Sequence, residues 1–257
     1  IYIYIQNFMA AIQDNKSQFV SKDTIKRLVK DVKDIMKNPL HDSGIYYVHS
    51  DTDMMFGKAL IIGPPNTPYE GGYYLFKFEF PCDYPHNPPK VTYFTNDGAT
   101  RFNPNLYKSG KVCVSILNTW RGPQWTGCQT ISSTLLCLCS AVLNDQPLLN
   151  EPGVRSDNPD YQNYMDIITY KNYEVAICGM LVRDNIMNEF PELHDIMAKH
   201  FCENYAAILG RITRDMAKEP KAERIVTTKI YGMKTKIRYT ITKTKIEEIY
   251  ESLTKLN

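Results

Sequence analysis

One segment of the chain combines a reactive side chain with an irregular sequence. Residues 101–125 are rich in Gly, Pro and aromatic residues, show neither helical nor strand periodicity, and contain Cys113. Long irregular segments inside compact domains often carry function. A loop cysteine can supply a thiolate, which is a good nucleophile near neutral pH even when only a small fraction is ionised. This segment is therefore the predicted reactive part of the chain.

The other six cysteines divide into two groups by their surroundings. Cys82 and Cys128 lie in predicted loops, and their roles stay open. The remaining four lie in helical patterns, where we expect small buried hydrophobic side chains: Cys137, Cys139, Cys178 and Cys202. The total of seven is odd, and the chain is long enough to fold without disulfides, so we expect a reducing compartment, cytoplasmic or nuclear. There is no CxxC motif, and we expect no metal site.

Two periodicities surround the irregular segment. Apolar residues alternate with period two in four runs separated by turn residues, which predicts a four-stranded antiparallel meander with strands at 45–48, 57–62, 73–80 and 91–94. Helical spacing predicts helices at 21–37, 129–144, 161–187, 193–212 and 245–256. The alternation of Thr and Lys over residues 227–245 predicts a hairpin. The expected fold class is α+β, with helices on the sheet.

The helix predicted at residues 21–37 has a basic face. Asp23 is its expected N-cap, and Asn38-Pro39 ends it because a residue before proline avoids helical angles. The exposed face carries five lysines: Lys22, Lys26, Lys30, Lys33 and Lys37. This face is either simply solvated or a docking surface for an acidic partner.

Composition argues against two classes of partner. The formal charge is +2, too small for the positive field that non-specific nucleic-acid binding requires. The longest apolar stretch, residues 131–143, is short and polar compared with the about 20 residues that span a bilayer. Residues 1–20 lack the basic leader and cleavage site of a secretory signal. We expect neither a nucleic-acid nor a membrane partner.

Several motifs occur in order along the chain. They are GPPNTPYEGG at 63–72, YPHNPPKV at 84–91, FNPN at 102–105 and LNEPG at 149–153, with seven residues between Asn105 and Cys113. Their order and spacing resemble ubiquitin-conjugating (E2) enzymes. Asn at position 103, extra residues 120–124 before Trp125, and helices after residue 153 are similar to the large Z-type class, as are VAIC at 175–178 and MAK at 197–199.

This resemblance implies a fold and an activity. The fold is the UBC fold, with an N-terminal helix, a four-stranded meander, an active-site loop, a crossover helix and C-terminal helices. The implied division is an N-terminal extension at 1–20, a UBC core at 21–187 and a helical, basic C-terminal extension at 188–257. The implied activity is to accept ubiquitin or a ubiquitin-like modifier from an activating enzyme (E1) as a thioester on Cys113 and to transfer it to a substrate lysine, usually with a ligase (E3). No cofactor is expected, since the E1 uses the ATP.

The resemblance also implies roles for residues near Cys113, which is expected to be an exposed loop thiol. Asn105 is the expected oxyanion donor or a brace for the loop, and both roles can hold. Pro104 and Asn103 are expected to shape the turn, with Asn103 replacing the family's His. The attacking lysine has an ordinary pKa of about 10.4, so it needs help to lose its proton or to be desolvated. The family often places an acidic residue on the loop after the crossover helix, and Asp145 or Glu151 is the candidate. The alternative is that either carboxylate simply caps or solvates a loop.

Docking surfaces follow from the same resemblance. Lys26, Lys30 and Lys33 are the expected E1 contacts. His86, Thr126 and Gly127 occupy the expected E3 loops, but they differ from the family pattern, which predicts altered contact with RING ligases.

Two alternatives remain at this stage: an inactive UBC variant that only binds partners, against which Cys113 argues, and a cysteine hydrolase, which the five histidines do not support because none lies in a catalytic motif.

Overall fold

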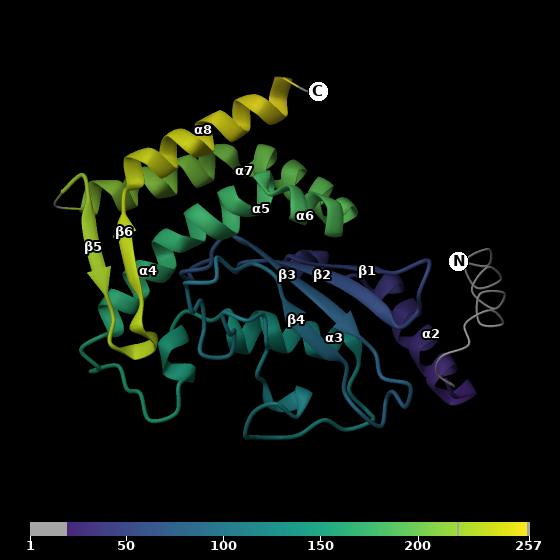
Figure 1. The fold of residues 1–257 in the computed structure, drawn as a ribbon. Helices are drawn as coiled ribbons and strands as arrows, with labels where there is room; N and C mark the ends of the chain where they lie inside the picture. The colour runs from purple at the N-terminus through teal and green to yellow at the C-terminus, as the bar shows by residue number, and fades with distance from the viewer. Residues whose placement is uncertain (1–19, 220, 256–257) are drawn as a thin grey trace.

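The computed structural model describes residues 20–219 and 221–255, so the predicted extension at 1–20 lies outside the described residues apart from Val20. Its centre is an antiparallel sheet in which chain neighbours pair in the order β1 (Ile45–His49), β2 (Phe56–Ile62), β3 (Tyr73–Glu79) and β4 (Lys90–Tyr93). Figure 1 shows this sheet with helices on both sides. The predicted meander and the α+β class are confirmed.

Helix α2 (Lys22–Lys37) precedes the sheet. Its N-cap is Ser21, whose side chain accepts a hydrogen bond from the backbone N–H of Thr24 at 3.0 Å, so the prediction of Asp23 as the cap was wrong. Asp23 instead lies in the first turn, where its charge favours the helix dipole. Leu28, Val32 and Ile35 are buried, which leaves the lysine face in solvent.

The helix that follows the irregular segment begins later than predicted. Helix α3 (Ile131–Cys137) continues as a wider helical turn through Leu138–Val142. Thr130 caps it through a capping box with Ser133, in which each side chain bonds the other residue's backbone N–H. The predicted residues 129 and 130 therefore belong to the loop.

The C-terminal helices also depart from their predicted ends. Helix α4 (Tyr161–Lys171) continues through Asn172–Gly179 into α5 (Met180–Val182), but Arg183 is extended and separates α6 (Asp184–Glu189), so one predicted helix is broken. Helix α7 (Pro191–Lys218) is longer than predicted.

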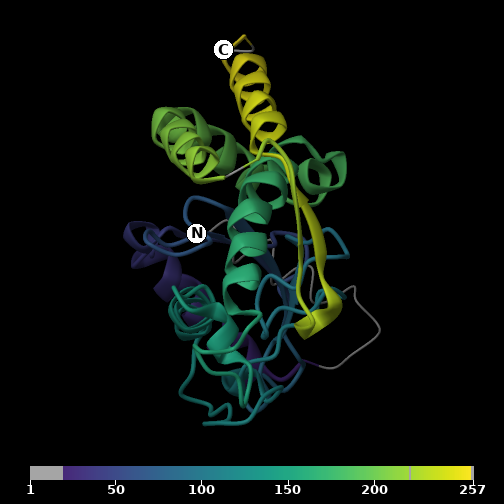
Figure 2. The ribbon, with the colours of Figure 1, turned by 90° about the vertical axis from the view of Figure 1, so that its left-hand side faces the viewer.

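The last part of the C-terminal extension forms the predicted hairpin and final helix, with shifted boundaries. Strand β5 (Arg224–Thr227) pairs with β6 (Lys234–Ile237), and α8 (Tyr239–Lys255) begins six residues before the predicted start. Tyr239 and Thr242 are buried, so tertiary packing makes helix from residues whose Thr-rich sequence favours strand. Figure 2 shows the long hairpin running down one side of the molecule, beside α4.

The C-terminal elements cover one face of the sheet. The carboxylate of Glu189 in α6 pairs with Lys77 at 3.1 Å, and the Tyr73 hydroxyl lies 3.1 Å from His200 Nδ1 of α7. Phe190 packs edge-on against Phe94 with ring centroids 5.0 Å apart. Buried residues of the sheet and of α7 and α8 form one apolar core. No helix among the described residues is long and apolar enough to cross a bilayer.

Candidate active site

The Asn103–Asn105 turn is held by side-chain amides. The Asn103 Oδ1 accepts the backbone N–H of Asn105 at 2.8 Å, and its Nδ2 donates to the carbonyl of Val142 at 2.7 Å and to the hydroxyl of Tyr69 at 3.1 Å. Asn103 is fully buried, so these bonds satisfy an amide that would otherwise be costly to bury. The Asn at this position therefore ties the turn to the end of the helix that follows the loop.

Cys113 lies directly against this turn. Its backbone N–H donates to the carbonyl of Asn105 at 2.8 Å, and the Asn105 Nδ2 donates to the carbonyl of Cys113. Cys113 is only 2% exposed, so the expectation of an exposed thiol was wrong. The neighbouring bridge between Leu106 and Val112, both of which are buried, continues this pairing.

Asn150 is part of the same network, although sequence analysis assigned it no role. Its Nδ2 donates to Asn105 Oδ1 at 2.9 Å and to the carbonyl of Ala141 at 2.9 Å, and it lies 3.4 Å from Asn103 Oδ1. The Asn105 amide is therefore engaged at both ends, by Cys113 and by Asn150. The sequence feature that points to Asn150 is its position in the LNEPG motif at 149–153, which carries the family resemblance but assigns this residue no role.

The two candidate carboxylates have different surroundings. The Glu151 carboxylate, next to Asn150, accepts a hydrogen bond from the Tyr231 hydroxyl. Burial, followed by this hydrogen bond, raises the pKa of Tyr231 well above its ordinary value, so the phenol stays protonated and donates. Asp145 is exposed and lines a cavity of about 370 Å³ with Arg214 and Lys218 of α7. Glu151 thus directly follows Asn150, the residue that bonds Asn105, and its carboxylate is held by Tyr231, whereas Asp145 faces the cavity.

The other thiols differ in burial. Cys178 is buried, and that burial raises its thiol pKa to about 12, which keeps it protonated. Its predicted burial is confirmed, whereas the prediction was wrong for Cys137, Cys139 and Cys202, which are only half-buried. Cys128 is exposed. The described residues contain no group of three or more His, Cys, Asp or Glu side chains that could hold a metal ion.

Comparison with known proteins places this arrangement in a family. The family model described as "Ubiquitin-conjugating enzyme" matches residues 27–170, more than half of the chain. The chain belongs to the ubiquitin-conjugating enzyme family. The matched region contains the sheet, the Asn103–Asn105 turn, Cys113 and Asn150.

Individual relatives point to the Z-type class. The chain is 41% identical to ubiquitin-conjugating enzyme E2 Z of Danio rerio over 75% of this chain and 58% of that protein. It is 42% identical to the E2 Z of Homo sapiens over 70% of this chain and 50% of that protein. A dual E2 ubiquitin-conjugating enzyme/E3 ubiquitin-protein ligase of Homo sapiens is 35% identical over 69% of this chain and 4% of its own length. The chain thus spans half to three-fifths of the E2 Z relatives, and the resemblance to that class is confirmed.

The residues predicted to dock other members of the ubiquitin-conjugating pathway lie at the surface. Lys26, Lys30 and Lys33 are exposed on α2. His86, Thr126 and Gly127 are exposed on two neighbouring loops, which the indole N–H of Trp125 joins by donating to the carbonyl of Pro85 at 2.8 Å.

One arginine connects these two surfaces. The guanidinium of Arg27 in α2 donates to the carbonyls of Gly127 and Gln129 and, at 2.9 Å, to the carboxylate of Asp31. The basic helix and the predicted E3 loops are therefore adjacent parts of one surface in this ubiquitin-conjugating fold.

Proposed function

We propose that this chain accepts ubiquitin or a ubiquitin-like modifier from an E1 as a thioester on Cys113 and transfers it to a substrate lysine, usually with an E3. The observation that carries this proposal is the paired bonding of Cys113 with Asn105 inside the region that matches the family. The E1 spends the ATP, so the chain needs no cofactor of its own. The odd number of cysteines supports a reducing setting, the cytoplasm or nucleus.

The proposed chemistry is two acyl transfers. In the first, the Cys113 thiolate attacks the carbonyl carbon of the E1-bound thioester, and the E1 thiolate leaves. In the second, a lysine amine attacks the new thioester, a tetrahedral oxyanion forms, and the C–S bond breaks to release the Cys113 thiolate. Because the thiol is buried in the structure, the loop must open to admit the E1 thioester.

Asn105 is proposed to serve both as brace and as oxyanion donor. Its Nδ2 donates a hydrogen bond to the carbonyl of Cys113, the residue whose sulfur would carry the modifier. Since Asn150 holds the other end of the amide, the N–H donors are fixed in direction before any substrate arrives. Preset donors of this kind stabilise an oxyanion without further reorganisation.

The lysine must lose a proton to become a nucleophile. Glu151 is the proposed carboxylate for this step, because it directly follows Asn150, which bonds Asn105, and its carboxylate is held in place by the Tyr231 hydroxyl. Asp145 is the second candidate. Lys26, Lys30 and Lys33 are proposed to contact the E1, and His86, Thr126 and Gly127 the E3.

The test is incubation with E1, ATP and ubiquitin, followed by gels with and without reducing agent. We expect a DTT-sensitive adduct on the parent and on C128S, which removes the exposed thiol instead. C113S should form no thioester, although an ester to the new hydroxyl can persist in DTT. An inactive binding module or a hydrolase would give no adduct on the parent. A DTT-sensitive adduct on C113S would place the thioester elsewhere.

A further inference from the structure

The tip of the β5–β6 hairpin reaches the catalytic loop from far along the chain. Tyr231, in the turn Ile230–Gly232, has φ of 62° and ψ of 2°, a left-handed conformation that is uncommon for a bulky residue. Strained backbone of this kind persists only when the surroundings hold it. The contacts of Tyr231 show what holds it.

Tyr231 makes three contacts with residues near Cys113. Its hydroxyl donates to the carboxylate of Glu151, and its ring centroid lies 5.0 Å from the guanidinium carbon of Arg101. Its backbone carbonyl accepts a hydrogen bond from Lys108 Nζ at 3.4 Å. One residue of the hairpin thus touches both chain segments that flank the site, residues 101–108 and Glu151.

Arg101, which Tyr231 contacts, also bonds the Asn103–Asn105 turn. Its Nε donates to the carbonyl of Asn103 at 3.1 Å and its Nη2 to the carbonyl of Pro104 at 2.7 Å. The same guanidinium carbon lies 3.3 Å from the ring centroid of Tyr107. A planar guanidinium suits this combination of two carbonyls and two aromatic rings, which a lysine ammonium would not match.

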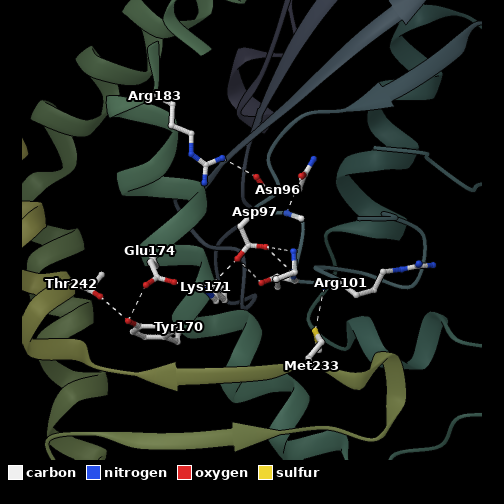
Figure 3. Close-up of polar contacts among 12 residues, drawn as sticks. Asn96, Asp97, Arg101, Tyr170, Lys171, Glu174, Arg183, Met233 and Thr242 are labelled. Carbon is white, nitrogen blue, oxygen red and sulfur yellow. Dashed lines mark hydrogen bonds and ion pairs between the residues drawn. The ribbon is translucent and has the colours of Figure 1, made fainter. Parts of the chain in front are cut away.

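The backbone of Arg101 is anchored to the C-terminal half as well. Its N–H donates to the sulfur of Met233, two residues after Tyr231, and its carbonyl accepts from the hydroxyl of Tyr164 at 2.9 Å. Figure 3 shows Met233 pointing from the hairpin toward Arg101. It also shows two contacts that hold the residues preceding Arg101. Asp97 forms an ion pair with Lys171 at 3.2 Å, and the guanidinium of Arg183 donates to the carbonyl of Asn96.

We propose that Tyr231 is a positioning residue for the transfer step, acting as a clamp that holds Arg101 against the Asn103–Asn105 turn and Glu151 beside it. This inference rests on the function proposed above. Tyr231 itself touches none of the reacting atoms, so it acts through Arg101 and Glu151. The C-terminal hairpin is then part of the active site.

The first test measures how accessible the Cys113 thiol is, with no ubiquitin present. Alkylation of each cysteine by iodoacetamide is followed by mass spectrometry in the parent, Tyr231→Ala and Tyr250→Phe. Tyr231→Ala should speed labelling of Cys113 about 10-fold, the size expected for losing one charge-assisted hydrogen bond. Cys128, which is exposed, and Cys178, which is buried in the core, should keep their rates. Tyr250→Phe alters a tyrosine that stacks on Tyr205 and should change none of them.

The second test measures transfer. In single-turnover discharge of the loaded protein to free lysine, Tyr231→Ala should lower kcat about 10-fold with little change in the KM for lysine, because the clamp orders the site and does not bind the amine. Tyr231→Phe keeps the ring on Arg101 but loses the bond to Glu151, so its kcat should be intermediate. Loading by the E1 should form a thioester on all these variants.

The outcomes separate this inference from the proposed function. If the parent forms no thioester, the proposed function fails, while the alkylation rates still decide whether the clamp exists. Unchanged labelling of Cys113 in Tyr231→Ala overturns the clamp. So does faster labelling of Cys178 in parallel, which would indicate general unfolding. A normal kcat in a variant whose Cys113 is readily labelled overturns the positioning role.

Discussion

At the scale of single residues, the Asn105 amide joins the nucleophile to the rest of the site. Its Nδ2 bonds Cys113 and its Oδ1 accepts from Asn150, so Asn105→Ala removes a donor and a brace together. We expect lysine discharge to fall about 10²-fold, as for the loss of one oxyanion contact, while loading stays measurable. The bracing part should appear as faster proteolysis between residues 101 and 125.

Asn150→Ala serves as the matched variant, because it frees one end of the Asn105 amide but keeps the donor. Its discharge should fall less, about 10-fold, as for one hydrogen bond. Discharge of Asn105→Ala at the parent rate would contradict both roles of Asn105.

Sequence could predict the part of this site whose residues lie close together along the chain. Asn103, Asn105 and Cys113 lie within one segment, so their spacing alone suggests a common turn. Asn150 and Tyr231 reach that turn only because the chain folds back, and no local pattern records such a contact. The burial of Cys113 was missed for the same reason, since loop placement does not show which side of a loop packs inward.

At the scale of elements, helix α2 presents its lysines to solvent, where a docking role depends on charge. Reversing Lys26 and Lys30 together to Glu should slow loading by the E1, because opposite charges steer association. Discharge of preformed thioester should be unaffected. The defect should shrink as salt rises, since screening acts over about 8 to 10 Å at physiological ionic strength.

Reversal of Lys199 and Lys255, exposed on α7 and α8, makes the same change in net charge as a control. Loading of the Lys26 and Lys30 double variant at the parent rate in low salt would rule out the docking role, as would an equal effect of the control.

Strand β1 carries a histidine whose titration should affect stability. Burial lowers the pKa of His49 to about 4 from its ordinary 6.5, and its Nδ1 lies 2.8 Å from the Tyr47 hydroxyl. Between these values the unfolded chain binds the proton more readily, so the free energy of unfolding rises with pH. We expect His49 to contribute a gain of about 2 kcal/mol from pH 5 to pH 7, measured by urea unfolding. His49→Gln should lose this gain, and His86→Gln, at an exposed position, should keep it. Equal pH slopes in parent and His49→Gln would contradict the assignment.

Element types were easier to predict than element ends. Period-two and helical patterns span whole strands and helices, so the sheet, α2 and α7 follow from sequence. Ends depend on single contacts, such as the Ser21 side chain on Thr24, or on burial, as at Tyr239 and Thr242 in α8. Arg183 breaks a helical pattern while its guanidinium donates to the Asn96 carbonyl, a tertiary contact that periodicity does not report.

At the scale of the whole molecule, the predicted boundary between a core at 21–187 and an extension at 188–257 runs through continuous packing. Tyr239 packs edge-on against Tyr170 with ring centroids 5.3 Å apart, and the Thr242 hydroxyl donates to the hydroxyl of Tyr170 at 3.1 Å. Phe190 packs against Phe94, which directly follows β4, and the Met233 sulfur accepts the backbone N–H of Arg101. From this shared core we expect the two parts to fold as one cooperative unit.

Ile246 in α8 tests this cooperativity, because it is fully buried and lies far along the chain from the reactive loop. Both tryptophans, Trp120 and Trp125, lie in that loop, so their fluorescence reports the loop, while far-UV circular dichroism reports all the helices. Ile246→Ala should cost about 3 kcal/mol, and in urea both probes should shift to the same lower midpoint. Ile241→Ala, at a position that is 56% exposed, should change stability by less than about 0.5 kcal/mol. If Ile246→Ala moved the dichroism transition and left the fluorescence transition in place, the C-terminal elements would unfold as a separate unit.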